Sequence, residues 1–292
     1  MRWLSDDAVA HLRNVTELPD LTGTRYRLVG EIARGGMGVV YEADDLELER
    51  RVALKVLASE LASADAVERM RSEARIIARL EHPGSVPVHD VGTLPDGRIF
   101  YAMKLVRGTR LDRWAREDRS LTELLRAFVR VCEAVAFAHA NGVVHRDLKP
   151  ENVMVGELGA VLVMDWGVAT RIGEDEEIIA GTPGYMPPES VVDARTDVFA
   201  LGAMLRSLVG NAPRQLVAIC AKATAHDRDT RYADARALAE DVLRFLDAEP
   251  VSAYRENVFE IVWRWIVRYR ALIAIVTAYL VMRALVFFFA SL

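Results

Sequence analysis

The chain has 292 residues, enough for a two-lobed domain with extensions, and its apolar content of 52% supports a sizeable core. A net charge of −5 argues against a nucleic-acid partner. Cys132 and Cys220 form neither a disulfide framework nor a metal site, which predicts a reducing compartment, and the N-terminal residues lack the apolar core of a signal peptide.

The first 24 residues form a polar lead-in, with a short amphipathic helix expected at 6–15, and residues 26–32 have the pattern of a strand. A glycine-rich segment follows, Ala33-Arg34-Gly35-Gly36-Met37-Gly38-Val39-Val40. Glycines between two strands let the backbone approach phosphates and offer free amides to them. The alternative is an ordinary glycine-rich hairpin turn.

A single lysine, Lys55, stands in the apolar strand predicted at 51–57. The next segment has helical spacing of its apolar residues, at Val67, Met70, Ala74 and Ile77. Glu73 falls at the edge of that apolar face, and an inward carboxylate needs a partner, for which Lys55 is the candidate. The alternative is that both side chains are simply solvated.

Strands are expected at 85–92 and 98–105, and a long helix at 121–140 that closes at Asn141-Gly142. The segment 143–155 then places a dense polar loop, His145-Arg146-Asp147-Leu148-Lys149-Pro150-Glu151-Asn152, between two apolar, β-prone runs. A further strand ends in the carboxylate of Asp165-Trp166-Gly167. Ordinary turn residues between two short strands are the competing interpretation of the polar loop.

These motifs, together with Val52-Ala53-Leu54-Lys55 and Gly181-Thr182-Pro183-Gly184-Tyr185-Met186-Pro187-Pro188-Glu189, resemble bacterial eukaryotic-like (Hanks-type) serine/threonine protein kinases over residues 25–247. The resemblance implies an α+β, two-lobed kinase fold in a domain at 25–249. The β-rich N-lobe would occupy 25–105 and the mostly helical C-lobe 106–249.

The resemblance also implies the chemistry. Asp147 would orient the substrate hydroxyl and accept its proton, and Lys149 would stabilise charge on the transferring phosphoryl group. Lys55, paired with Glu73, would contact the α- and β-phosphates, and Thr182 would contact both Asp147 and Lys149 and favour Ser/Thr substrates.

ATP is the implied phosphoryl donor, with Mg²⁺ or Mn²⁺ held by Asn152 and Asp165. Met103 would be the gatekeeper beside adenine, followed by the hinge at 104–106. The residues implied to bind ATP are Ile32, Gly35, Gly36, Gly38, Val40, Ala53, Lys55, Met103, Lys104, Val106 and Met154.

Supporting roles are implied for His145, Arg146, Trp166, Glu189, Asp197 and Arg231. Trp166 replaces the Phe of the Asp-Phe-Gly pattern, and its indole N–H needs a partner if buried. Glu189 would pair with Arg231. Asp197 would bind the backbone of the polar loop at 145–152, which the resemblance implies is the catalytic loop. Ala33 stands where the family pattern has its first glycine.

Two further departures affect regulation and docking. Residues 171–180 contain no hydroxyl side chain, so we expect Glu174, Asp175, Glu176 or Glu177 to supply a constitutive anion for Arg146, against the alternative of a solvated acidic loop. Residues 208–213 run almost directly into a helix at 215–224, where the family has a further helix and long loops that commonly dock protein substrates.

The C-terminal part has a membrane-like pattern. Residues 250–270 form a juxtamembrane amphipathic helix with aromatic anchors, and 271–292 carry one charge, Arg283, over about 33 Å of helix. Arg264, Arg268 and Arg270 precede this transmembrane segment, which predicts a single-pass inner-membrane protein with its kinase domain in the cytosol. The alternative is an apolar helix packed on the kinase or in an oligomer.

The leading function is therefore a membrane-anchored kinase that phosphorylates protein Ser/Thr hydroxyls, including its own, with no nucleic-acid partner. A nucleotide-binding pseudokinase or scaffold is the alternative, which Ala33, Trp166 and the short 208–213 segment favour. A small-molecule phosphotransferase is disfavoured, because the segment at 181–189 with Arg231 builds a shelf for protein substrates.

Overall fold

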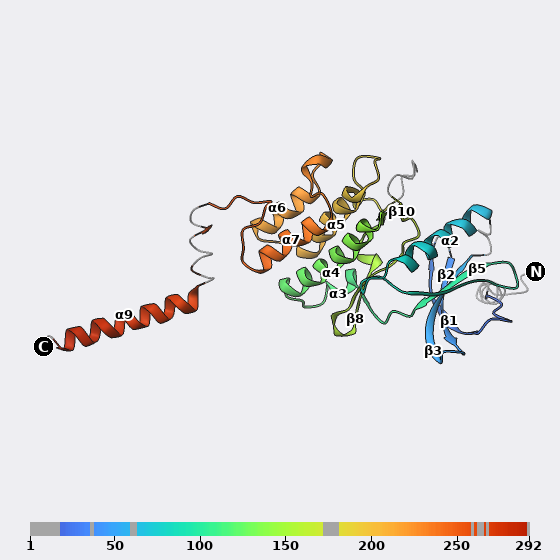
Figure 1. Cartoon of the computed structure of the whole chain (residues 1–292), viewed down its shortest axis with the longest axis horizontal. Helices are drawn as coiled ribbons and strands as arrows, with labels where there is room; N and C mark the ends of the chain where they lie inside the picture. The colour runs from blue at the N-terminus through green and yellow to red at the C-terminus, as the bar shows by residue number, and fades with distance from the viewer. Residues whose placement is uncertain are drawn as a thin grey trace, which may run out of the picture.

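The computed structural model describes residues 18–35, 38–58, 63–171, 181–257, 260–261, 266 and 269–290. Figure 1 shows two lobes, one containing a sheet and one mostly helical. The sheet is antiparallel, with strand order β1-β2-β3-β5-β4. Its strands are β1 (Tyr26–Gly35), β2 (Gly38–Asp45), β3 (Arg50–Leu57), β4 (Val88–Thr93) and β5 (Ile99–Lys104).

Strand β3 shows how the alternation of side chains divides the core of the N-lobe. Val52, Leu54 and Val56 join a buried cluster on one face of the sheet. Ala53 and Leu57 belong to the main core cluster on the opposite face, together with buried residues of α2 (Ala64–Arg79). Successive side chains of a strand point to opposite faces, so Lys55 lies on the same face as Ala53 and Leu57.

Helix α2 has the predicted amphipathic pattern. Ser63 caps it, accepting a hydrogen bond from the Ala66 backbone N–H at 3.2 Å. Met70, Ala74 and Ile77 are buried. Glu73 is also buried, at 2% exposure, which puts its carboxylate inside the fold and excludes the alternative of a solvated helix Glu.

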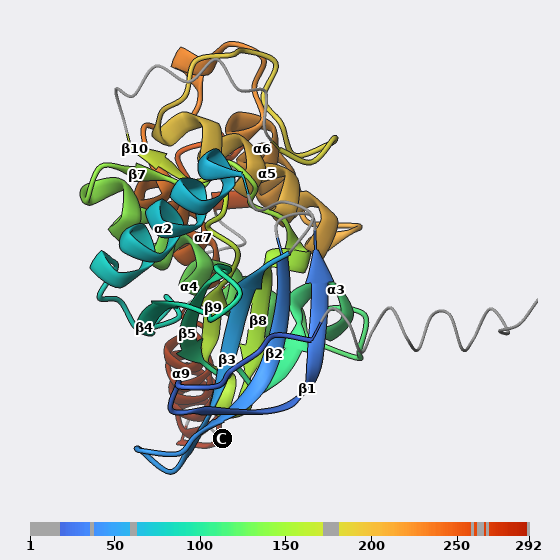
Figure 2. The ribbon, with the colours of Figure 1, turned by 90° about the vertical axis from the view of Figure 1, so that its right-hand side faces the viewer.

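The C-lobe packs its helices around α4 (Leu121–Ala140), whose ends agree with the prediction and which begins with a capping box between Ser120 and Glu123. In Figure 2, β8 (Val153–Gly156) and β9 (Val161–Val163) are seen behind the N-lobe sheet, whereas β7 (Val143–Val144) and β10 (Thr170–Arg171) appear higher in the view. Besides α4, the elements of the C-lobe are β6 (Gly108–Arg110), α3 (Leu111–Trp114), β7 (Val143–Val144), η2 (Pro150–Asn152), β8 (Val153–Gly156), η3 (Glu157–Gly159), β9 (Val161–Val163), β10 (Thr170–Arg171), α5 (Ala194–Val209), α6 (Arg214–Ala223), η4 (Arg228–Thr230) and α7 (Ala235–Leu246).

Three predicted element boundaries need correction. Strand β4 begins at Val88, because Ser85 instead forms an isolated parallel bridge with Val163 of the C-lobe. Strand β9 ends at Val163, two residues before Asp165, since the chain turns into the cleft there. Helix α6 begins at Arg214 with Pro213 as its N-cap residue, so only residues 210–213 join α5 to α6.

Helix α9 (Arg270–Ala290) lies apart from both lobes in Figure 1. Among the residues that the structure describes, none of the helices combines the length and the apolar composition needed to cross a membrane. Several predictions lie outside the described residues: the helix at 6–15, Gly36, the acids at 174–177, and residues 258–259, 262–265 and 267–268 of the amphipathic helix predicted at 250–270. Residues 250–257 of that predicted helix are described and are not helical, so its N-terminal part was predicted wrongly.

Candidate active site

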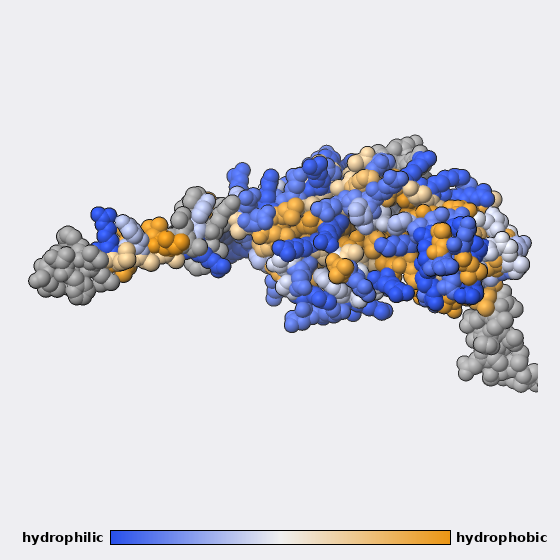
Figure 3. All heavy atoms as spheres, turned by 60° about the horizontal axis from the view of Figure 1, so that its bottom comes forward, coloured by the Kyte–Doolittle hydropathy of each residue, from blue (hydrophilic) through white to orange (hydrophobic). Residues whose placement is uncertain are grey.

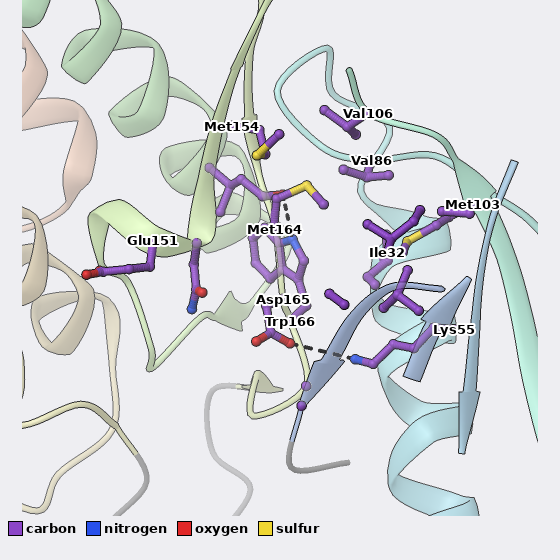
Figure 4. Close-up of a pocket in the computed structure, with 18 of the residues that line it drawn as sticks. Ile32, Lys55, Val86, Met103, Val106, Glu151, Met154, Met164, Asp165 and Trp166 are labelled. Carbon is purple, nitrogen blue, oxygen red and sulfur yellow. Dashed lines mark hydrogen bonds and ion pairs between the residues drawn. The ribbon is translucent and has the colours of Figure 1, made fainter. Parts of the chain in front are cut away.

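A cleft of about 810 Å³ lies between the lobes and is lined by residues from both. Apolar side chains gather at one end of it, where Figure 4 shows Met103, Val106 and Met154 on opposite walls. Lys55 and Asp165 lie at the other end, joined by a dashed line in Figure 4. A flat apolar ligand group fits the first end and an anionic group fits the second.

The described residues of the glycine-rich segment belong to the ends of β1 and β2, where Gly35 pairs with Gly38 and both glycines line the cleft. A Cβ at Gly38 would lie 2.3 Å from the carbonyl oxygen of Val56, so only glycine fits against β3 there. Ala33 also lines the cleft and pairs with Val40 in the β1–β2 ladder, so the alanine is accommodated as an ordinary strand residue.

The predicted ion pair is present. Lys55 Nζ donates to Glu73 Oε1 at 2.6 Å, and it lies 3.7 Å from Asp165 Oδ1. The Lys55 side chain is 12% exposed, so its ammonium reaches the cleft while its stem is covered. One lysine thus connects β3, α2 and Asp165, which lies two residues after the end of β9.

A hydrogen-bonded cluster surrounds Asp147, which lines the cleft together with Asn152. Asp147 Oδ2 accepts from Lys149 Nζ at 2.7 Å and from Asn152 Nδ2 at 3.0 Å. The Thr182 hydroxyl donates to Asp147 Oδ1 at 2.7 Å and accepts from Lys149 Nζ at 2.7 Å. Burial raises the pKa of Asp147, but the bonds from Lys149 and Thr182 outweigh burial and leave that pKa below its usual value. The carboxylate is therefore ionised at neutral pH.

Asn152 and Asp165 both line the cleft beside this cluster. Asn152 Nδ2 also donates to the backbone carbonyl of Asp147 at 2.8 Å, which leaves the side-chain oxygen of Asn152 as the atom available to a ligand. The Asp165 side chain is 55% exposed. Arg146 and Asp165 have φ of 71° and 59°, the left-handed region that side chains other than glycine rarely adopt, so the backbone is strained at two positions of the site.

Trp166 is buried at 1% exposure and packs on His145, with ring centroids 4.6 Å apart. Its indole N–H donates to the Val163 carbonyl at 3.3 Å, so the partner required of a buried indole is present. The His145 ring is held between the Met164 carbonyl at Nε2 (2.9 Å) and the Asp147 N–H at Nδ1 (3.3 Å). A tryptophan therefore fills this position without an unsatisfied polar group.

Asp197 lies fully buried on α5 beneath the catalytic loop. Its carboxylate accepts from the backbone N–H groups of His145 (2.8 Å) and Arg146 (2.9 Å), and lies 2.8 Å from His139 Nε2. Burial raises the pKa of Asp197, but the bond from His139 and the loop amides outweigh burial, so the pKa lies below its usual value. One side chain therefore holds both the catalytic loop and the end of α4.

The pair of Glu189 and Arg231 is present and bidentate, with N–O distances of 2.6 and 2.8 Å. The Arg231 side chain is fully buried and also donates to the Ala225 carbonyl at 2.8 Å. Burial raises the pKa of Glu189, but Arg231 outweighs burial and lowers that pKa overall. This pair fixes the segment after Thr182 to the C-lobe.

The sequence analysis named many of the residues that line the cleft and missed others. Every predicted ATP-binding residue within the described part of the chain lines the cleft. Tyr101, which donates to Glu73, and His139, which bonds to Asp197, were not predicted. The alternation of β5 against β3 was the signal available for Tyr101. Further lining residues that were not predicted are Val86, Gly108, Thr109, Arg110, Arg113, Glu151, Val163, Met164, Gly167 and Val168.

A two-lobed fold with a lysine–glutamate pair above an Asp-x-Lys-x-x-Asn loop defines a phosphotransferase of the kinase class. The protein kinase domain family model matches residues 26–244, and the chain belongs to that family. The kinase domain of PknI from Mycobacterium tuberculosis has a similar structure, with a TM-score of 0.61 and 26% identity over 76% of this chain and 96% of that one.

Curated relatives give the type of kinase. The chain is 33% identical over 224 residues to the serine/threonine-protein kinase PknD of Protochlamydia amoebophila, covering 63% of this chain and 23% of that protein. It is 39% identical over 206 residues to the DNA damage-responsive serine/threonine-protein kinase RqkA of Deinococcus radiodurans, covering 66% of this chain and 31% of that protein. The chain thus spans less than half the length of these relatives, and the shared part is a Hanks-type bacterial serine/threonine kinase domain.

Proposed function

We propose that this chain is an active protein kinase that transfers the γ-phosphoryl group of ATP to Ser and Thr hydroxyls of proteins, itself included. The bonded cluster of Asp147, Lys149, Asn152 and Thr182 carries the proposal, because it places an ionised carboxylate and an ammonium side by side in the cleft. Asp147 orients the acceptor hydroxyl and receives its proton, and Lys149 stabilises the charge on the transferring group. A scaffold that only binds nucleotide would not need this cluster.

The donor set fits a bound Mg²⁺. The side-chain oxygen of Asn152 and the carboxylate of Asp165 are hard oxygen ligands in the cleft, and Mg²⁺ is commonly held by one or two protein oxygens together with substrate phosphates. No group of three His, Cys, Asp or Glu side chains among the described residues could hold a metal by itself. When bound, the ion would neutralise charge on the β- and γ-phosphates.

Transfer to defined acceptors tests this function. The full chain is incubated with γ-labelled ATP, Mg²⁺ and a generic protein acceptor, and the labelled amino acids are then identified. We expect phosphoserine and phosphothreonine without phosphotyrosine. Removal of the metal by a chelator should slow transfer by about a hundredfold, because the ion neutralises charge on the phosphates. At least about 95% of the label should therefore be lost. Nucleotide binding without any transfer to protein would instead support the pseudokinase.

We also propose that the C-terminal segment anchors the kinase domain to the cytosolic face of a bacterial inner membrane. Its support is the apolar sequence of 271–292 and the exposure of α9 side chains, whose hydrophobic colouring is visible in Figure 3. The exposed apolar residues of this helix are Ile273, Ile275, Val276, Tyr279, Leu280, Val281 and Met282. A helix with apolar side chains on all sides needs a bilayer or a partner to cover it.

Charges placed in α9 test the anchor. We expect the full chain to stay in the membrane pellet after a carbonate wash, and the double variant Val276→Asp/Leu280→Asp to be released, because each Asp costs about 3 kcal/mol in hydrocarbon. Val217→Asp, at an exposed valine of α6, is the matched control and should stay in the pellet. Recovery of the unaltered chain in the wash as a soluble oligomer would contradict the anchor and favour helix packing.

A further inference from the structure

Glu73 receives a second donor in addition to Lys55. The Tyr101 hydroxyl donates to Glu73 Oε1 at 2.9 Å, the same oxygen that accepts from Lys55 Nζ. Among the described residues, the other carboxylate oxygen of Glu73 is buried and has no hydrogen-bond partner. Both donors to the Glu73 carboxylate, Lys55 and Tyr101, therefore bind the same oxygen, Oε1.

The strand register explains how the three side chains meet. Lys55 of β3 and Tyr101 of β5 are direct partners in the antiparallel ladder, so their side chains leave the sheet on the same face. That face carries α2, which supplies Glu73. Lys55 Nζ also lies 5.7 Å from the centre of the Tyr101 ring, within the range of a cation–π contact.

The two donors differ in exposure and in what else they bind. Lys55 ends at the cleft, 3.7 Å from Asp165, and must also reach the phosphates of the nucleotide. Tyr101 is 2% exposed, and its ring is fixed in the main core cluster. Burial, followed by the charge of Glu73, raises the pKa of Tyr101 well above 10, so the hydroxyl keeps its proton and remains a donor.

We propose that Tyr101 is a positioning residue for phosphoryl transfer, which holds Glu73 and α2 in place when the ammonium of Lys55 is shared with the phosphates. Without this hydroxyl, Glu73 would have Lys55 as its one donor, and nucleotide would compete with Glu73 for it. The proposal rests on the kinase activity proposed above and concerns how the Lys55–Glu73 pair is maintained during the reaction.

Tyr101→Phe tests the proposal, because it keeps the ring and removes only the hydroxyl. We expect kcat to fall about tenfold, the size of one hydrogen bond to a charged group, with KM for ATP changing less than about twofold. Amide hydrogen exchange in α2 should become faster. Tyr26→Phe is the matched control, since Tyr26 is a buried tyrosine of the same lobe whose hydroxyl donates to the Asp90 carboxylate at 3.0 Å, away from the cleft.

A double-mutant cycle separates positioning from packing. In a Glu73→Gln background, Tyr101→Phe should lower kcat by less than about twofold, because the charged acceptor is already absent. An equal loss in both backgrounds would mean that Tyr101 acts only through packing and would overturn the proposal. Unchanged kcat together with unchanged α2 exchange in Tyr101→Phe would overturn it as well. Absence of transfer by the wild-type chain would count against the proposed kinase activity, and the exchange of α2 would still report on Tyr101.

Discussion

Asp147→Asn is expected to lower kcat about a thousandfold, within the range of about 10² to 10⁴ for a positioned proton acceptor. The carboxylate accepts from Lys149, Asn152 and Thr182, and the amide of Asn would place an N–H against one of these donors. KM for ATP should change less than about threefold, because the adenine end of the cleft is untouched.

Steady-state kinetics on the purified chain measures both constants. Glu157→Gln, at an exposed acid of the same lobe, is the control and should keep the wild-type rate. Because the pKa of Asp147 lies below its usual value, its carboxylate stays ionised from pH 6 to 8, and this group should cause no change of kcat across that range. More than a tenth of the wild-type kcat in Asp147→Asn would contradict the role assigned to the carboxylate.

Asp197→Ala should lower the free energy of unfolding by about 3–5 kcal/mol, the cost of breaking a buried charged network. The substitution leaves the His145 and Arg146 amides and His139 Nε2 without their acceptor. The melting temperature of the domain should fall by about 10 °C. Asp229→Asn is the control, because the Asp229 side chain is 78% exposed, and its loss should change stability by less than about 0.5 kcal/mol.

The sign of the pH dependence follows from the lowered pKa of Asp197. A carboxyl group whose pKa is lower in the folded state stabilises the fold above its unfolded pKa, and this stabilisation is lost as the pH falls through the folded pKa. The difference in unfolding free energy between wild type and Asp197→Ala should therefore be largest near neutral pH and shrink below about pH 4. Denaturant titrations at several pH values measure it, and a difference that grows in acid would contradict this account.

The sequence predicted the site well where chemistry needs fixed residue types at short spacing. Asp147, Lys149 and Asn152 lie within one loop, so their proximity follows from the chain itself. The contact of Glu73 with Lys55 was predictable for a different reason. The helical periodicity of α2 placed a carboxylate at the edge of the apolar face, and a carboxylate directed inward needs a partner.

What the sequence did not predict depends on strand register and on contacts between lobes. Tyr101 looks like an ordinary core residue of an apolar strand until the ladder places it opposite Lys55. Ser85 was predicted to begin β4, whereas it forms a bridge with Val163 that depends on how the lobes dock. His139 sits at the end of a regular helix, where only the position of α5 shows that it meets Asp197.

The left-handed backbone at Arg146 and Asp165 has a consequence for how this domain can change under selection. Glycine would relax the backbone at both positions, yet at residue 165 it would also remove the carboxylate that lines the cleft. Selection for heat resistance alone would favour glycine at residue 165, whereas selection for turnover would retain Asp165. This position would therefore distinguish sequences retained for stability from sequences retained for phosphoryl transfer.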